Sequence, residues 1–289
     1  MLSETLTSRP RIPAWIRTKV AGGDRYTQIR DSKRRFNLHT VCEEARCPNV
    51  GECWTHGTAT FMLMGDVCTR RCNFCSVEKG RPGALDLNEP EHIAEVVEAM
   101  GLDYLVLTSV NRDDLVDQGS GHIAATIEAV HRRLPACKVE MLVPDFRGDA
   151  DCIRRVVETP LTVLAHNLET VPRLTKEVRN GAQYDRSLSV LSQAKQLRPG
   201  MLTKSGLMLG LGETREELHE VFRDLRRHDC DILTLGQYLR PSPEQLPVVA
   251  FITPGEFADL RDDALSLGFR HVESGPMVRS SYHAWEHVR

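Results

Sequence analysis

The sequence lacks a long apolar run, an excess of one charge and an even number of cysteines. Each of these absences excludes a class of protein. No stretch approaches the roughly 18 apolar residues of a membrane helix, so we expect no membrane span. The 37 basic and 40 acidic residues give a net charge of −3, which leaves no global positive field to attract nucleic acid. The nine cysteines are odd in number, whereas a secreted disulfide framework is normally even, so we expect reduced thiols and a cytoplasmic protein.

Repeats and low-complexity segments are also absent, and the balance of 41% hydrophobic and 27% charged residues is that of an ordinary globular protein. A chain of 289 residues allows one barrel-sized domain or two small ones. Its pattern divides into three parts. We expect an irregular extension over residues 1–57, a regular α/β region over 58–268, and a short tail over 269–289.

From Thr58 onward, short apolar runs alternate with amphipathic stretches. The runs expected as strands are Thr60–Met64, Tyr104–Thr108, Lys138–Val143, Leu161–Ala165, Leu202–Leu209 and Ile232–Leu235. The stretches expected as helices are Glu91–Met100, His122–Leu134, Asp151–Glu158, Ser187–Gln196, Glu213–Arg227 and Gly255–Leu267. Such alternation predicts a parallel sheet with helical crossovers. Because a complete barrel needs eight units, six units predict an α/β fold of the open, partial (β/α)6 barrel type.

Polar residues and glycines follow the expected strands. In a barrel of parallel strands the chemistry lies at the carboxyl ends of the strands. The residues at these ends that we take as site candidates are Thr108, Asn111, Arg112, Asp113, Glu169, Gly210 and Gln237. The first strand leads into Cys68–Cys75, so this segment is expected on the same face.

Six of the nine cysteines form two triplets in the first quarter of the chain. The first is Cys42, Cys47 and Cys53, spaced C-x4-C-x5-C, and the second is Cys68, Cys72 and Cys75, spaced C-x3-C-x2-C. Three thiolates cannot complete a tetrahedral metal site, whereas a 4Fe–4S cubane held by three cysteines keeps one iron open. The triplets therefore predict two iron–sulfur clusters, each needing a fourth ligand from elsewhere. Structural zinc is the alternative, although zinc sites usually combine Cys-x2-Cys pairs into four ligands.

Some of these residues also have purely structural interpretations. Glu169 could be a carboxylate at a helix N-terminus, and residues 111–113 could be an ion-paired loop. His166 and His283 are interpreted as hydrogen-bonded scaffold. The three scattered cysteines, Cys137, Cys152 and Cys230, are interpreted as small core residues.

In the second triplet, Phe74 directly precedes the last cysteine, and an expected strand precedes the first cysteine. This arrangement resembles the radical S-adenosylmethionine superfamily. The resemblance implies that the open iron binds the amino and carboxylate groups of S-adenosylmethionine. A 5′-deoxyadenosyl radical then takes a hydrogen atom from an unactivated carbon. The residues it implies for S-adenosylmethionine binding are Phe74, Thr108, Glu169, Gly210 and Gln237.

The first triplet stands fifteen residues before the second, and the tail contains the motif Arg279-Ser280-Ser281-Tyr282. This combination resembles the lipoyl synthase family. Further similar segments are residues 42–49, 69–75, 111–115, 144–146, 167–170 and 204–208, so the resemblance runs from about Pro13 to His283. One departure is Asp117-Gln118-Gly119-Ser120, where Asp-Gly-Gly-Ala is expected. It adds bulk to a loop near the active face, and we expect it to leave the reaction unchanged.

This resemblance implies that the chain inserts two sulfur atoms at C6 and C8 of an octanoyl chain linked to a lysine of a lipoyl carrier protein. Two molecules of S-adenosylmethionine supply the radicals, and the auxiliary 4Fe–4S cluster on the first triplet donates the sulfur. The resemblance implies Ser281 as the fourth ligand of that cluster, with Ser280 as the second choice. It further implies that Arg279 holds the substrate or covers the cluster, and that Asn111, Arg112 and Asp113 shape the substrate channel.

The partners that the resemblance implies are an octanoylated glycine-cleavage H protein or E2 lipoyl domain, a flavodoxin or ferredoxin, and a carrier that restores the spent cluster. Two other classes stay open. One is a different radical sulfur-inserting enzyme, similar to biotin synthase or to a methylthiotransferase, against which the tail serine and the paired triplets argue. The other is a zinc-ordered adaptor or an electron-carrying iron–sulfur protein, which metal and sulfide analysis would distinguish.

Overall fold

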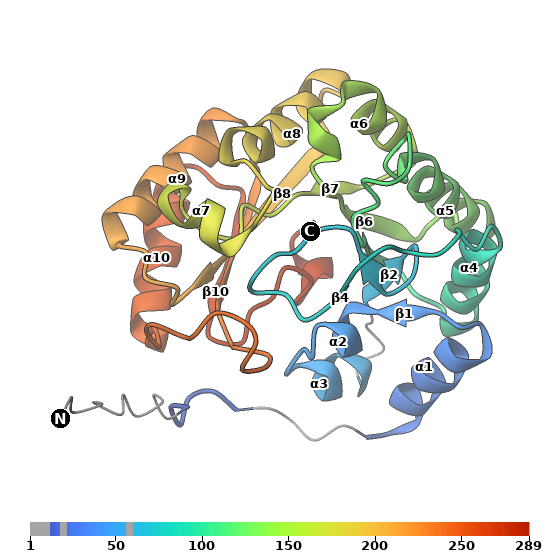
Figure 1. Ribbon diagram of the computed structural model, residues 1–289, viewed down its shortest axis with the longest axis horizontal. Helices are drawn as coiled ribbons and strands as arrows, with labels where there is room; N and C mark the ends of the chain where they lie inside the picture. The colour runs from blue at the N-terminus through green and yellow to red at the C-terminus, as the bar shows by residue number, and fades with distance from the viewer. Residues whose placement is uncertain (1–11, 18–21, 56–59, 289) are drawn as a thin grey trace.

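The computed structural model describes residues 12–17, 22–55 and 60–288, and it is built around one mostly parallel sheet (Figure 1). The strands of this sheet are β1 (His39–Thr40), β2 (Thr60–Leu63), β5 (Tyr104–Ser109), β6 (Lys138–Leu142), β7 (Val163–Ala165), β8 (Leu202–Leu209), β9 (Ile232–Gln237) and β10 (His271–Gly275). They are paired in this order along the sheet. The pairing of β1 with β2 is antiparallel and all other neighbours are parallel.

Helices follow the strands and form the outer layer (Figure 1). They are α4 (Glu89–Met100), α5 (Ser120–Arg133), α6 (Ala150–Val157), α8 (Tyr184–Leu197), α9 (Arg215–Arg227) and α10 (Pro254–Ser266), with the shorter η1 (Phe146–Gly148) and α7 (Pro172–Val178) between them. In α9, a capping box of Thr214 and Glu217 satisfies free backbone N–H groups at the start of the helix. Leu218, Val221 and Leu225 then recur at helical spacing and are buried, so one face of the helix packs on the sheet.

The sheet is an open, partial barrel. Its edges are β1 and β10, and no strand pairing joins these two edges within the part of the chain that the structure describes. The six strands expected from the sequence are all present, and Leu202–Leu209 has the expected bounds. The predicted α/β partial barrel is therefore confirmed. The expected boundary between residues 57 and 58 lies outside the described residues.

The extension is more regular than the sequence suggested. We expected little structure over residues 1–57, but the structure has α1 (Asp24–Arg35), α2 (Val41–Glu44) and α3 (Val50–Thr55) there, in addition to β1. Their apolar residues are few and widely spaced, so no periodic pattern is visible. The structure nevertheless buries Ile29 of α1 and Trp54 of α3, and the rings of Tyr26 and Trp54 lie 5.1 Å apart.

The tail also differs from the expectation, because β10 continues the sheet in parallel register with β9. Only Val272 of this strand is fully buried. The alternation that identifies a strand in a sequence is therefore missing.

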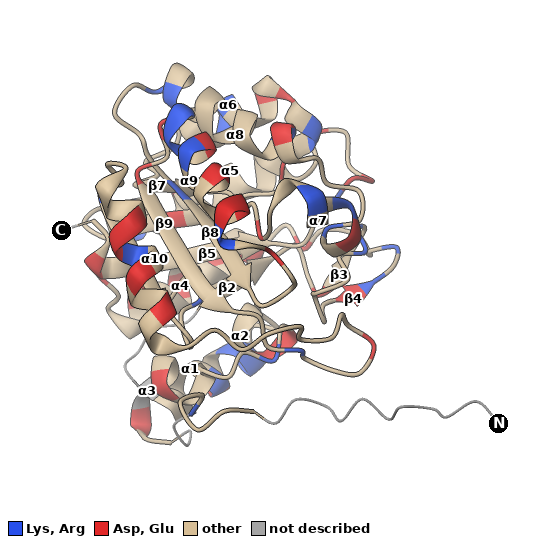
Figure 2. Ribbon diagram, turned by 90° about the vertical axis from the view of Figure 1, so that its left-hand side faces the viewer, with Lys and Arg blue, Asp and Glu red and all other residues tan. Residues whose placement is uncertain are grey.

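Charged residues of both signs are spread over the helices, whereas the strands carry few (Figure 2). An exception lies inside the barrel, where Lys204 of β8 donates a 2.7 Å hydrogen bond to Glu140 of β6. Tyr104 of β5 donates to the same carboxylate at 2.8 Å. Since Lys204 and Glu140 are both buried, loss of either partner would leave an uncompensated charge in the interior.

None of the helices in the described ranges has both the length and the apolar character that crossing a bilayer requires.

Candidate functional site

A cavity of about 470 Å³ lies where the carboxyl ends of the strands meet the loops that follow them, and both cysteine triplets reach it. Its wall includes Cys42 and Cys47 of the first triplet and all three cysteines of the second, Cys68, Cys72 and Cys75. Cys53 is half-buried and does not line the cavity. All nine cysteines are free thiols.

The first triplet is carried by two short helices. Cys42 lies in α2, Cys47 follows it in a turn closed by a 3.0 Å hydrogen bond from its N–H to the Cys42 carbonyl, and Cys53 lies in α3. Burial, reinforced by the nearby Cys47 thiol, raises the pKa of Cys42 to about 11. Burial and the charges of Cys42 and Cys47 raise the pKa of Cys53 to about 12. The charges of these thiols act on one another, so a bound cation is needed to hold all three as thiolates.

The second triplet lies on a loop after β2 that is closed by two small paired strands, β3 (Val67–Cys68) and β4 (Glu78–Lys79). The backbone N–H of Asn111 donates to the Cys68 sulfur at 3.3 Å. Burial raises the pKa of Cys75 to about 11, and burial also raises the pKa of Cys72, against the opposing charge of Arg179. As in the first triplet, a bound cation is needed to hold these thiols as thiolates, the form that binds metal.

Two carboxylates hold this loop in place through Arg70. The guanidinium donates to Asp113 at 3.0 and 2.9 Å and to Asp145 at 2.6 Å. Thr69 also donates to Asp113, at 2.8 Å. Burial opposes ionisation of both carboxyls, but the hydrogen bonds and charge of Arg70 outweigh it, so the pKa values of Asp113 and Asp145 lie below their ordinary value.

The tail motif lies over the first triplet. Ser280 and Ser281 line the cavity, as does Arg279, whose burial lowers its pKa despite the nearby Cys47 thiol. Asn49 anchors this segment by donating to the Met277 carbonyl at 2.7 Å. The backbone after Met277 passes so close to the sheet that a Cβ on Gly236 would lie 2.1 Å from the Val278 oxygen.

Of the residues predicted to bind S-adenosylmethionine, all but Gly210 line the cavity; those that do are Phe74, Thr108, Glu169 and Gln237. Glu169 has a φ of +65°, a strained conformation for a residue with a side chain, and it receives a 3.0 Å hydrogen bond from Asn167. Burial raises the pKa of Glu169. The Gln237 amide donates to the Leu209, Tyr238 and Ala250 carbonyls, so its hydrogen bonds hold the following loop.

The predicted channel residues separate into two groups. Asn111 lines the cavity, whereas Arg112 and Asp113 do not. Arg112 is buried and donates to Asp114 at 2.8 Å and to the Gly83 carbonyl at 3.0 Å. Together with the contacts of Asp113 to Arg70, these bonds form the ion-paired loop that the alternative interpretation describes, and a role of residues 112 and 113 in shaping the channel stays a prediction.

Gln118, which stands where the family resemblance predicts glycine, is accommodated by its immediate surroundings. Gln118 has a φ of +51°, a conformation that favours glycine. Its amide donates a buried 2.9 Å hydrogen bond to the Phe146 carbonyl, which offsets part of the strain.

Arg179 is a site residue that the sequence did not indicate. It lines the cavity, is buried, and donates to the Leu168 carbonyl at 3.3 Å and to Ser187 at 2.9 Å. Its charge acts on both Cys72 and Glu169. Arg179 directly follows α7, a helix absent from the predicted pattern, so no motif pointed to it. His166 uses both ring nitrogens, to the Val143 carbonyl at 2.8 Å and to Ser187 at 3.0 Å, as expected for scaffold.

The cavity has features of a site for bound groups. The buried Asn167 Oδ1 and Ser109 Oγ face this region without a hydrogen-bond partner among the described residues. Unpaired buried acceptors and donors are costly unless a ligand or water satisfies them. Soft thiolate donors in two groups suit iron–sulfur clusters, and the orphan polar atoms suit a polar cofactor beside them. The residues present therefore fit clusters together with S-adenosylmethionine.

Comparisons with known proteins agree with this chemistry. Residues 62–225 match the Radical SAM superfamily, and residues 2–47 match the N-terminal domain of lipoyl synthase of the Radical SAM family. A lipoyl synthase from Rubrobacter xylanophilus is 56% identical over 95% of this chain and 85% of its own length. Lipoyl synthases from Koribacter versatilis and Laribacter hongkongensis are 53% and 54% identical, over 95% and 98% of this chain and 90% of their own lengths.

Solved structures share the fold at low identity. Methylornithine synthase superposes with a TM-score of 0.58 at 17% identity, covering 74% of this chain and 70% of that one. HydG, a maturase of the [FeFe]-hydrogenase, superposes with a TM-score of 0.55 at 13% identity, covering 78% and 58%. Given the identity to the curated relatives over nearly the whole chain, this protein is a radical, sulfur-inserting enzyme that uses S-adenosylmethionine and 4Fe–4S clusters, and it belongs to the lipoyl synthase family.

Proposed function

We propose that this enzyme inserts sulfur at C6 and C8 of an octanoyl chain that is amide-linked to a lysine of a carrier protein, giving a lipoyl group. The observation that carries the proposal is that cysteines of both triplets line the same cavity. A hydrogen-abstracting centre and a sulfur source must both reach one acyl chain, and a shared cavity allows this. Both target carbons lack an acidifying neighbour, so acid–base catalysis cannot activate them.

We assign the cluster that binds S-adenosylmethionine to Cys68, Cys72 and Cys75, and the auxiliary cluster to Cys42, Cys47, Cys53 and Ser281. When bound, the first group supplies 5′-deoxyadenosyl radicals from two molecules of S-adenosylmethionine and the second supplies sulfur. The location of Ser281 on the cavity wall supports its assignment, but Ser280 lines the same wall, so the choice between them depends on experiment.

The protein's own residues position and shield these groups. The Asn111 N–H stabilises negative charge on the Cys68 sulfur, and Arg70 holds the loop of the second triplet against residues 113 and 145. Arg179 supplies a fixed positive charge beside Cys72 and Glu169. For the acyl chain, Met62, Leu142 and Met208 offer an apolar surface in the cavity wall.

Thr108, Phe74, Glu169 and Gln237 remain our candidates for contact with S-adenosylmethionine. Asn167 joins them because its Oδ1 is buried and unpaired in the cavity wall. We assign Gly210 an indirect role. A Cβ at this position would lie 2.3 Å from the Ala250 oxygen, so Gly210 allows the loop beyond Gln237 to pack.

The substrate is carried by an octanoylated lipoyl carrier protein, the class on which lipoyl synthases act. We further propose a glycine-cleavage H protein or an E2 lipoyl domain as that carrier, and a flavodoxin or ferredoxin as the electron donor. Because the auxiliary cluster is consumed as the source of sulfur, a separate carrier protein must restore it between turnovers.

An anaerobic assay tests the proposal. Reconstituted protein is mixed with S-adenosylmethionine, a strong reductant and an octanoylated carrier domain, and the products are followed by mass spectrometry. We expect 5′-deoxyadenosine together with a carrier heavier by two sulfur atoms. Deoxyadenosine without a thiolated carrier would point to another substrate. In a separate metal and sulfide analysis, we expect about eight irons and eight sulfides per chain. Zinc without sulfide would overturn the proposal.

A further inference from the structure

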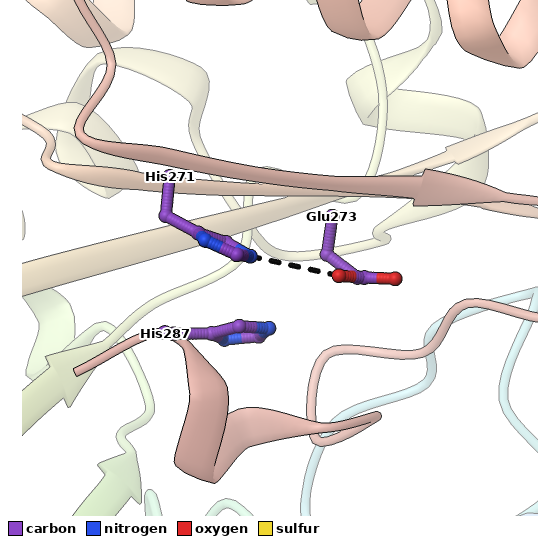
Figure 3. A group of neighbouring side chains, drawn as sticks. All are labelled: His271, Glu273 and His287. Carbon is purple, nitrogen blue, oxygen red and sulfur yellow. Dashed lines mark ion pairs between the residues drawn. The ribbon is translucent and has the colours of Figure 1, made fainter. Parts of the chain in front are cut away.

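A second group of metal-ligand side chains lies away from the cavity, where the end of the chain returns to β10. His271 and Glu273 are two residues apart on β10, so they project from the same face of the strand. His287 follows the short helix η2 (Ala284–Glu286). The three side chains converge on one space between strand and tail (Figure 3), and one ligand atom from each lies within 4.8 Å of the others.

The rings of His271 and His287 pack against each other with centroids 4.5 Å apart, but three of their four nitrogens lack hydrogen-bond partners among the described residues. His287 is 1% exposed, and neither of its ring nitrogens has a hydrogen-bond partner among the described residues. His271 Nε2 is also unpaired, since its 3.5 Å separation from Glu273 Oε2 is longer than an ordinary hydrogen bond. An imidazole buried in this way loses its hydrogen bonds to water, and a ring contact does not replace them, so its nitrogens stay unsatisfied unless something binds them.

We propose that His271, Glu273 and His287 bind a divalent cation, with Zn²⁺ as the best match. Two imidazoles and one carboxylate form a common zinc ligand set, which leaves a fourth position for water. Ligands roughly 2.0–2.1 Å from a tetrahedral zinc ion lie about 3.4 Å from one another. The His271–Glu273 pair already has this spacing, at 3.5 Å. The His287 ligand atom lies within 4.8 Å of both, so it must approach them by at most about 1.4 Å, the difference between 4.8 Å and about 3.4 Å.

The surroundings permit a cation. Burial, together with the nearby Lys204, His271 and His283, lowers the pKa of His287, so its imidazole is neutral and able to act as a metal ligand. Lys204 is itself paired with Glu140 at 2.7 Å. The side chains of His271 and Glu273 are 30% and 24% exposed, which gives the ion a path from solvent. None of the three residues lines the cavity that holds the cysteine triplets, so the site is separate from the one described above.

The site would fasten the end of the chain to the sheet. Residues 274–286 lie between the ligands, and this segment contains Ser280 and Ser281. A cation that links His287 to β10 closes this segment into a loop and restricts the positions of the tail serines. Closing a loop by a metal lowers the conformational entropy of the free chain, which stabilises the closed form. The inferred role is therefore to restrain the tail, and it is distinct from sulfur insertion.

The test measures zinc, not turnover. Protein carrying its iron–sulfur clusters is produced with zinc supplied, dialysed against a weak chelator and analysed for zinc, and the zinc environment is read by X-ray absorption. We expect one zinc per chain with nitrogen and oxygen neighbours at about 2.0–2.1 Å and no sulfur shell near 2.3 Å. A sulfur shell would mean zinc in the cysteine sites, and absence of zinc would mean that no such site exists. Either result overturns the proposal.

Variants locate the ion. His287→Ala should lower bound zinc by more than about tenfold, and Glu273→Gln, which preserves side-chain volume, should lower it in the same direction even if His287→Ala folds poorly. His131→Ala, at an exposed histidine of α5, is the matched control and should retain zinc. Retention of zinc by Glu273→Gln at the wild-type level would contradict the proposal. Hydrogen exchange of residues 276–288 should slow on zinc addition in the wild type and not in Glu273→Gln.

Discussion

Arg70 and Asp113 form a two-pronged ion pair, in which Nε lies 3.0 Å from one carboxylate oxygen and Nη2 lies 2.9 Å from the other. Arg70 stands between Cys68 and Cys72, whereas Asp113 follows β5. Parallel hydrogen bonds of this type fix orientation as well as distance. The pair therefore holds the loop of the second triplet against the carboxyl end of the barrel.

Removing the charge of Asp113 should loosen that loop. For Asp113→Asn we expect a loss of about 1–3 kcal/mol in the free energy of unfolding, because Arg70 keeps only part of its charge-assisted bonding. We also expect lower iron content and less 5′-deoxyadenosine per chain after reconstitution. Asp151→Asn is the control, since Asp151 is paired with Arg154 on an exposed face of α6. Equal iron content in the two variants would refute this role for Asp113.

Ser281 should separate radical formation from sulfur transfer. Ser281→Ala should still produce 5′-deoxyadenosine, while the rate of thiolated product formation falls at least about tenfold, equivalent to about 1.4 kcal/mol in the barrier. Ser280→Ala, one residue earlier on the same cavity wall, should retain product formation. The reverse result would transfer the ligand role to Ser280.

Replacing Cys53 tests whether a cysteine that does not line the cavity can still be a ligand of the auxiliary cluster. The charges of Cys42 and Cys47 act on its thiol, so we expect Cys53→Ala to lose the auxiliary cluster and to fall from about eight irons to about four. Iron analysis and Mössbauer spectroscopy measure this change. Cys152→Ser, at a buried cysteine of α6, is the matched control and should keep its iron. A Cys53→Ala protein with the full iron content would remove Cys53 from the ligand set.

Gly236 should be intolerant of a side chain because the tail backbone lies against it. A Cβ at this position would lie 2.1 Å from the Val278 oxygen, so Gly236→Ala must displace the segment that leads to Ser281. We expect a stability loss of about 1–3 kcal/mol together with slower sulfur insertion. Gly255→Ala, at the start of α10, is the control, since its Cβ would lie 3.9 Å from Thr253 Oγ1. Wild-type thermal unfolding and product formation by Gly236→Ala would contradict the close contact.

Much of the barrel could be predicted because its strands and helices bury regular patterns. Leu105–Leu107 of β5 is an uninterrupted apolar run that is fully buried, and such a run identifies a central parallel strand. By contrast, β10 has one fully buried residue and α1–α3 bury a few isolated side chains such as Trp54. These elements are stabilised by distant partners, and local periodicity cannot report such contacts.

The sequence by itself determined the chemistry of the site. The spacing of two cysteine triplets and the tail motif at 279–282 are local features, because ligand type and chain reach are local properties. Only the tertiary structure decided that cysteines of both triplets share a cavity with Ser281. It also decided that Arg179 lies near Cys72, and that Arg112 pairs with Asp114 instead of lining the cavity. It also brought His287 to His271 and Glu273. These relationships arise from packing between segments far apart in the chain, and the energy of such packing depends on neighbours that no single stretch of sequence contains.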